Sequence, residues 1–386
     1  MTTPTRRKEP KSVKPHVMIV GAGLLGYGVL ELLMRRSEDV RITVVGTDRE
    51  QTRRRANLAL HAVTQMGYYP SVEADQVDLF DVDRTAELIA RVAPDVIFTT
   101  ASLQPWWQIF ELPKALAEEI DRASIGPWLP MQLTLVYHLM QAVRRAGSDA
   151  KVVNAALPDV THALLDTAGL APTIGVGNVA NVVPGLRRAA ADLLDVPLRS
   201  VQLRLVAEAF VSSGLKNDHT VNGAPYLLHV LVDDVDRTAD VSVPDVVRLL
   251  STRYARIGAR DGTRLTAASA LTVLDAVLDD TGAVVHAPGP NALIGGYPVR
   301  VWRDRVELAL PEGVTEQQAR EVNERAMVFD GIAEVRPDGT AVYTPENMAI
   351  IEKFLGYSAR TVHLDESRAQ AEELGAAYRA FRDGLS

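Results

Sequence analysis

A glycine-rich turn near the start of the chain limits the folds open to it. Residues 17–20 (VMIV) are apolar, residues 21–26 read GAGLLG, and residues 27–36 have a helix-like pattern. Strand, glycine turn and helix follow one another in this order in dinucleotide-binding units, where the glycines allow a tight turn, close approach of backbone N–H groups to a pyrophosphate, and close helix packing. We therefore expect a diphosphate to bind at the helix N-terminus, against Gly21, Gly23, Leu24, Leu25 and Gly26.

Composition excludes several classes of protein. The chain has 386 residues, 47% of them hydrophobic and 23% charged, as in a globular protein of about two domains. A net charge of −8 argues against a nucleic-acid partner, and no apolar run is long enough for a membrane span. The absence of cysteine and of an HExxH motif indicates no thiolate chemistry and no metal site. Residues 1–15 are polar and basic without an apolar stretch, which predicts a disordered tail, and the nucleotide-binding fold suggests a cytoplasmic protein.

The pattern of residues 16–156 alternates between strand and helix. Strands are predicted at 41–45, 95–101 and 151–155, and helices at Arg49–Gln65 and 129–146. Such alternation predicts an α/β fold with a doubly wound parallel Rossmann sheet.

Residues 157–340 predict an α+β substrate domain. Residues 200–211 and 224–233 alternate like strands around a polar segment, 212–223. Helices are predicted at 243–257 and 267–279, a hairpin at 299–310, and a helix at 315–326 with a capping box at Thr315. Residues 341–386 are interpreted as a helical C-terminal extension.

Four segments together resemble the lactate/malate dehydrogenase family, from about His16 to Phe329. Besides the glycine turn, VNAALPDVTHALL is similar to the family's Asn-Pro-x-Asp strand end, IGVGNVANVVPGLRR to its Gly-x-Gly-Thr helix start, and LRLVAEAF to its Gly-Glu-His-Gly strand. The resemblance implies a small-molecule substrate and a homodimer or homotetramer. Residues 81–102 also resemble the Rossmann half of saccharopine-type and short-chain dehydrogenases.

The catalytic residues of that family are not retained. Ala209 stands where the family keeps its histidine, Asn181 where it keeps an aspartate, and Pro184 where it keeps the arginine that binds the substrate carboxylate. The loop that should carry a second arginine reads Gln104-Pro105-Trp106-Trp107, and Asn154 matches the family's asparagine. The resemblance therefore implies the scaffold with a replaced catalytic set.

The residue about twenty positions after the glycines selects the cofactor. An acidic residue there binds the ribose hydroxyls of NAD, but this position is Gly46, followed by Thr47, Asp48 and Arg49. Without a carboxylate at that point, Thr47 and either Arg49 or Arg53 favour the 2′-phosphate of NADP. The alternative places Asp48 on the ribose and gives NAD. If the NADP assignment is correct, a Gly46→Asp variant should weaken the binding of NADP relative to that of NAD. Thr100, Ala101 and Asn154, at two strand ends, are further expected cofactor contacts.

Three residues are candidates for donating a proton or orienting the reactants: Asn154, His219 and His229. Asn154 could orient nicotinamide or substrate, or it could cap the turn after its strand. His219, in the polar segment, could donate a proton or be a solvated loop residue, and His229 faces either pocket or solvent. His162 is interpreted as a packed or surface histidine.

A second set of residues is predicted to contact substrate. Trp106 and Trp107 would form an aromatic lid or, alternatively, a subunit interface. The remaining candidates carry amide or ammonium groups and are Asn178, Asn181, Lys216 and Asn291.

These observations predict an NADP-dependent oxidoreductase. It would reduce a carbonyl or imine of a specialised small molecule, or oxidise the corresponding alcohol or amine. One alternative is an opine- or saccharopine-type amine dehydrogenase, and another is a non-catalytic NADP(H)-binding sensor.

Overall fold

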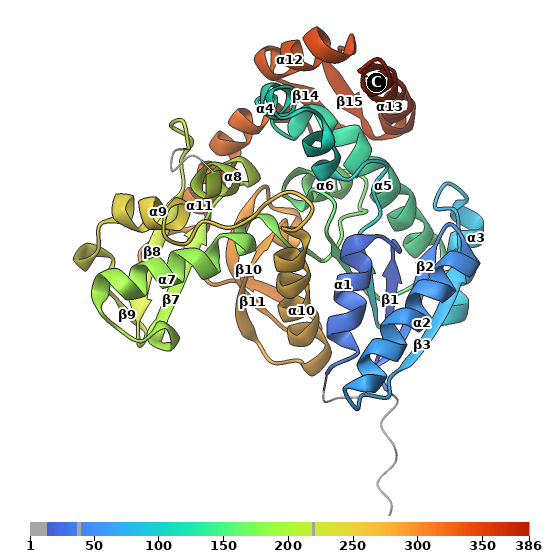
Figure 1. Ribbon diagram of the computed structural model, residues 1–386, viewed down its shortest axis with the longest axis horizontal. Helices are drawn as coiled ribbons and strands as arrows, with labels where there is room; N and C mark the ends of the chain where they lie inside the picture. Colours follow the sequence, from blue (N-terminus) through green and yellow to red (C-terminus); the bar gives the residue numbers. More distant parts are fainter. Residues whose placement is uncertain (1–13, 37–39, 218–220, 386) are drawn as a thin grey trace, which may run out of the picture.

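The fold is built on a parallel sheet. The structure is a computed structural model that describes residues 14–36, 40–217 and 221–385. Across these residues six strands form one parallel sheet in the order β3-β2-β1-β4-β5-β6, of which β1, β2 and β3 are labelled in Figure 1. They are β1 (His16–Val20), β2 (Arg41–Gly46), β3 (Ser71–Gln76), β4 (Val96–Thr99), β5 (Lys151–Asn154) and β6 (Ile174–Gly175). The strand order reverses between β1 and β4, where doubly wound sheets bind ligands.

The side chains of β1 alternate between two hydrophobic cores. Val17 and Ile19 pack with helices on one face of the sheet, and Met18 and Val20 pack with helices on the other. Burial on both faces explains why residues 17–20 of β1 are all apolar. The first face is covered by α1 (Leu24–Leu33), α2 (Arg49–Gln65) and α10 (Thr263–Asp279), and the second by α3 (Val82–Val92) and α5 (Leu129–Arg145). The predicted doubly wound α/β sheet is confirmed.

The second half combines small antiparallel sheets with helices, as predicted for an α+β unit. One sheet contains β7 (Val201–Val206), β8 (Leu227–Val232) and β9 (Val235–Asp236), and another contains β10 (Ala283–Pro288), β11 (Gly296–Val301) and β12 (Val306–Leu308). The helices are α6 (Pro158–Asp166), α7 (Val183–Leu194), α8 (Ala209–Asn217), α9 (Val243–Ser251) and α11 (Glu316–Met327). The hairpin at 299–310 and the Thr315 capping box are both present.

The strand predicted at 200–211 is wrong in its second half. Strand β7 ends at Val206, and helix α8 begins at Ala209. The Glu208 carboxylate accepts the N–H of Phe210 at 2.7 Å, which satisfies a donor in the first turn of α8. A run of alternating apolar residues this short fits a helix face as well as a strand.

Residues 341–386, interpreted as a helical extension, contain two helices together with strands that the interpretation omitted. Helices α12 (Pro345–Leu355) and α13 (Ser367–Asp383) flank a three-stranded sheet of β13 (Ile332–Val335), β14 (Thr340–Tyr343) and β15 (Thr361–His363). These strands are too short to give a clear alternating pattern in sequence. Their buried side chains join the core that contains α5, so this segment packs onto the first half of the chain (Figure 1). Within the described ranges, no helix is both long and apolar enough to cross a bilayer.

Candidate functional site

Two glycines of the turn after β1 are fixed by close packing. Gly21 has φ +108°, and a Cβ there would lie 2.5 Å from the Thr100 hydroxyl. That hydroxyl donates to the Gly21 carbonyl at 3.1 Å, and a Cβ on Gly26 would lie 2.0 Å from the same carbonyl oxygen. Thr100, predicted to contact cofactor, therefore holds the turn against the end of β4.

The middle glycine, Gly23, faces open space. No atom lies within 4 Å of a Cβ built there. Helix α1 starts at the next residue with no side-chain cap and no acidic residue in its first turn. Its first hydrogen bond runs from Tyr27 N to Gly23 O at 3.0 Å, so the N–H groups of Leu24, Leu25 and Gly26 have no intrahelical partner. A diphosphate fits this arrangement of donors and positive dipole.

Packing at the end of β2 gives Gly46 a different role from the predicted one in cofactor choice. A Cβ on Gly46 would lie 2.3 Å from the Thr52 hydroxyl and 3.0 Å from Ala22 Cβ. Gly46 is therefore required by packing of α2 and the glycine turn, and Gly46→Asp would disturb that packing instead of reporting cofactor choice. Beyond it Thr47 and Asp48 are exposed, and Asp48 caps α2 by accepting the Gln51 N–H at 2.9 Å.

Helix α2 carries four arginines near this end of the sheet, and three of them bear on the cofactor prediction. Arg49 is exposed at the first position of the helix, whereas Arg53 forms an ion pair with Glu50 at 2.7 Å. Arg55 donates to the Ala22 carbonyl in the glycine turn at 3.0 Å and lies over the Tyr27 ring. Sequence reasoning missed Arg55 because its proximity to the turn depends on how α2 packs on α1.

A cavity of about 340 Å³ lies beyond the carboxyl ends of β4 and β5. The predicted substrate residues Trp106 and Asn178 both line it. The other described lining residues are Asp121, Arg122, Ser124, Ile125, Leu157, Ala209, Phe210, Ser213, Gly214, Asn222 and Asp330. Because β4 is adjacent to β1 in the sheet, the cavity and the glycine turn share one edge.

Three acidic side chains from separate elements lie near one another, and Asp330 among them lines this cavity. Asp159 lies in the first turn of α6, Glu208 immediately precedes α8, and Asp330 ends the 3₁₀ helix η7 (Val328–Asp330). They are 0%, 0% and 3% exposed. Asn178 donates to Asp159 Oδ2, and Ile125 N donates to Asp330 Oδ1 at 3.4 Å. No group of described His, Asp or Glu side chains has the arrangement of a metal site.

Burial holds protons on this carboxyl cluster, as we call Asp159, Glu208 and Asp330. Loss of water raises the pKa of Asp159 to about 7. Burial and the nearby Asp330 and Asp159 carboxylates raise the pKa of Glu208 well above its usual value, and burial does the same to the pKa of Asp330. A protonated Glu208 donates to Asp330. Sequence reasoning missed this cluster, because Asp159 and Asp330 become buried through contacts between distant segments.

Asn154 is occupied by structural hydrogen bonds. It is fully buried, accepts from Ala156 N at 2.9 Å and donates to Ala156 O at 3.1 Å. Its amide also lies 3.1 Å from His162 Nε2, and His162 Nδ1 lies 2.8 Å from Gly289 O. Burial lowers the pKa of His162 to about 4. This geometry fits the turn-capping role of Asn154 and the interpretation of His162 as a packed residue.

The two lid tryptophans have different surroundings. Trp106 lines the cavity and meets Trp128 edge-on, with ring centroids 6.3 Å apart. Trp107 is not among the lining residues and lies beneath the Arg260 guanidinium, 5.6 Å from the ring centroid. Only Trp106, of these two, is placed to contact a ligand in the cavity.

Several other predicted residues are not brought to the cavity. Asn181 donates to Thr266 Oγ1 at 3.0 Å, and Asn291 donates to Val306 O at 3.0 Å. His229 lies 2.9 Å from Asp236 Oδ2, its partner on β9. His219 and the Lys216 side chain fall outside the described residues.

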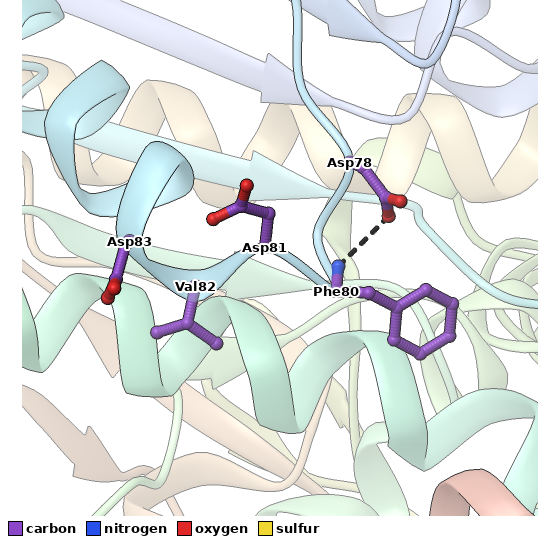
Figure 2. A pocket seen from close by; sticks show the side chains of 5 residues that line it. All are labelled: Asp78, Phe80, Asp81, Val82 and Asp83. Carbon is purple, nitrogen blue, oxygen red and sulfur yellow. Dashed lines mark hydrogen bonds between the residues drawn. The ribbon is translucent and has the colours of Figure 1, made fainter.

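A shallow acidic hollow follows β3, and turn chemistry explains it. Figure 2 shows Asp78, Asp81 and Asp83 around Phe80 and Val82. Asp78 accepts the Phe80 N–H at 3.0 Å, and Asp81 caps α3 by accepting the Arg84 N–H at 3.0 Å. Asp78 therefore stabilises the turn before α3 and Asp81 caps that helix, and we assign this hollow no further role.

Comparisons with known proteins agree with this architecture. Residues 17–119 match the model of the NAD dependent epimerase/dehydratase family. Lactate dehydrogenase from Eimeria maxima, solved with NADH and oxamate, is 15% identical, with TM-score 0.55 over 83% of this chain and 92% of that one. Malate dehydrogenase from Cryptosporidium parvum is 15% identical, with TM-score 0.53 over 82% and 96% of the two chains.

A third structure completes the comparison. Lactate dehydrogenase from Cryptosporidium parvum, complexed with lactic acid and nicotinamide adenine dinucleotide, is 16% identical, with TM-score 0.53 over 83% and 99% of the chains. No curated protein matches the sequence significantly. The predicted resemblance to a divergent lactate/malate dehydrogenase-like fold is confirmed, and the two lactate dehydrogenases named here were solved with NADH and with nicotinamide adenine dinucleotide.

Proposed function

We propose that this protein is an NADP-dependent oxidoreductase that reduces a carbonyl or imine of a small molecule, or oxidises the corresponding alcohol or amine. The observation that carries the proposal is the uncapped start of α1, with open space at Gly23, on the same sheet edge as a cavity. The amides of Leu24, Leu25 and Gly26 would hold the diphosphate. A bound nicotinamide would supply or accept hydride at the cavity.

Turnover tests the proposal. Purified protein with NADPH or NADP should change the reduced-nicotinamide absorbance when the right member of a carbonyl, imine, alcohol and amine panel is added. Binding of the dinucleotide with no change across the panel would favour the non-catalytic sensor. No binding at all would contradict both.

The surroundings of Arg49 support NADP over NAD. Arg49 is exposed at the end of β2, whereas Asp48 is engaged as a helix cap and Arg53 is paired with Glu50. A guanidinium at this position can bind a 2′-phosphate through charge-assisted hydrogen bonds.

Reversing the charge at Arg49 should change cofactor selectivity. We expect Arg49→Glu to raise the Kd of NADPH about tenfold and that of NADH less than about threefold. The control is Arg54→Glu, the same charge change on an exposed residue that pairs with Glu50. Fluorescence titration of both variants gives the two Kd values. Equal weakening of NADPH and NADH by Arg49→Glu would contradict the assignment.

A further inference from the structure

The glycine turn and its flanking elements carry no cation for a diphosphate. Residues 17–33 hold most of β1, the turn and α1, and they include no Lys, Arg or His. Their one charged residue is Glu31. A helix N-terminus has a partial charge of about half an elementary charge, which neutralises only part of a diphosphate anion. A full positive charge at this site must therefore come from another element.

Arg55 of α2 places a guanidinium at the turn. Its Nη1 donates to the Ala22 carbonyl at 3.0 Å, and the group lies over the Tyr27 ring. The Tyr27 hydroxyl donates to the Thr52 carbonyl at 3.2 Å, which ties that ring to α2. Side chains lean toward the N-terminal end of their helix, and for α2 this end lies at the carboxyl edge of the sheet. Because Ala22 directly precedes Gly23, the guanidinium lies beside the open start of α1.

The charge of Arg55 is not used within the described part of the chain. Arg55 is exposed, and none of the described carboxylates forms an ion pair with it. Glu50, the acid on the same helix, pairs instead with Arg53 and Arg54. A guanidinium presents several N–H donors in a planar fork, and the contact with Ala22 uses one of them. The remaining donors and the charge are free to bind an anion.

We propose that Arg55 binds the diphosphate of the dinucleotide at its adenosine-side phosphate. In folds of this kind the adenosine ribose binds at the end of the second strand, and Arg55 reaches the turn from the helix that follows that strand. Charge-assisted hydrogen bonds from a guanidinium fork suit a phosphate group. This inference rests on the proposed function, and it adds to that function a residue that binds both forms of the cofactor.

Arg49 and Arg55 have different tasks in this assignment. Arg49 is the first residue of α2, six positions before Arg55 in the chain. Six residues of helix span about 9 Å along the axis, so the two side chains start from different levels of the helix. Arg49 serves the 2′-phosphate, which only NADP carries, whereas Arg55 serves the diphosphate that NADP and NAD share.

Two substitutions at Arg55 separate its charge from its hydrogen bond. Arg55→Lys keeps the positive charge, whereas Arg55→Gln keeps an N–H donor for the Ala22 carbonyl without the charge. We expect Arg55→Gln to raise the Kd values of NADPH and NADH by similar factors, each about tenfold, and Arg55→Lys to raise them by less than about threefold. The matched control Arg54→Gln, at a neighbouring exposed arginine, should leave both within about twofold. Fluorescence titration of the full chain gives these values.

Salt dependence provides a readout that a merely structural role would not change. NADH is the probe, because it lacks the 2′-phosphate. Between about 50 mM and about 500 mM NaCl its Kd should rise at least about threefold for wild type, since salt screens the attraction between the guanidinium and the diphosphate. For Arg55→Gln the rise should stay below about 1.5-fold. Equal salt dependence in the two proteins would contradict the proposal.

The remaining outcomes are equally decisive. Weakening of NADPH alone by Arg55→Gln would place Arg55 at the 2′-phosphate, and this would overturn the assignment. Affinity kept by Arg55→Gln but lost by Arg55→Lys would show a structural hydrogen bond and would also overturn it. Unchanged affinity in both variants of a wild type that binds dinucleotide contradicts this inference alone. A wild-type chain that binds neither NADPH nor NADH contradicts the proposed function as well.

Discussion

Gly23→Asp is expected to abolish dinucleotide binding while leaving the protein as stable as before or more so. Gly23 is the N-cap of α1, its backbone is extended at φ −91° and ψ −169°, and a side chain meets open space. An aspartate there can cap the helix, which contributes a few tenths to about 1 kcal/mol of stability. The same carboxylate occupies and repels the diphosphate position, so the Kd of NADPH should rise at least about 100-fold.

The isosteric variant Gly23→Asn separates charge from bulk. Asparagine caps helices as well as aspartate does but carries no charge. We expect Gly23→Asn to weaken NADPH binding less than Gly23→Asp does, with similar thermal stability for both. Titration calorimetry gives the Kd values and thermal unfolding gives Tm. Wild-type affinity in Gly23→Asp would mean that the diphosphate does not bind at this turn.

The carboxyl cluster should make the protein less stable as the pH rises. Burial raises the pKa of Asp159 to about 7 from its ordinary value of 3.8. Between these values the unfolded chain has lost the proton that the folded protein keeps, so the free energy of unfolding falls as pH increases and levels off above about pH 7. Glu208 and Asp330 have raised pKa values as well and act in the same direction.

The Asp159→Asn variant isolates this contribution. The buried histidines His162 and His286, whose pKa values burial lowers to about 4 and about 3, act in the opposite direction in acid. The measured quantity is therefore the difference in free energy of unfolding between Asp159→Asn and wild type. We expect this difference to shift in favour of the variant by at least about 1.4 kcal/mol between pH 5 and pH 8, the equivalent of one pKa unit.

Urea unfolding at four or five pH values gives this difference. Glu312→Gln, which removes an exposed carboxylate, is the control and should follow the wild-type pH profile. A constant difference for Asp159→Asn across this pH range would show that Asp159 is not buried as a protonated acid.

The central strands and the glycine turn could be predicted because local pattern determines them. The apolar residues of β1, β2 and β4 are buried on both faces, and Gly21 and Gly26 of the turn each have a distinct steric reason. The polar strand β3, at the edge of the sheet, was not predicted, because its sequence SVEADQ lacks the apolar pattern of a buried strand.

The candidate site was predictable only in part, because its acids come together through tertiary structure. Trp106 and Asn178 were expected at the cavity and line it. Asp330 follows β11 and α11 in the chain yet reaches the Ile125 N–H, more than two hundred residues away in sequence. No spacing rule connects these positions. Gly46 shows the opposite error. We interpreted this glycine as a determinant of cofactor choice, but it is explained by packing, because a Cβ there would collide with the Thr52 hydroxyl.

The most direct test of this account is calorimetric titration of the full wild-type chain with NADPH, NADP, NADH and NAD. The account predicts saturable binding at one site per chain, with a Kd for NADPH below about 100 µM and weaker binding of NADH. Absence of binding by all four dinucleotides up to about 1 mM would contradict it.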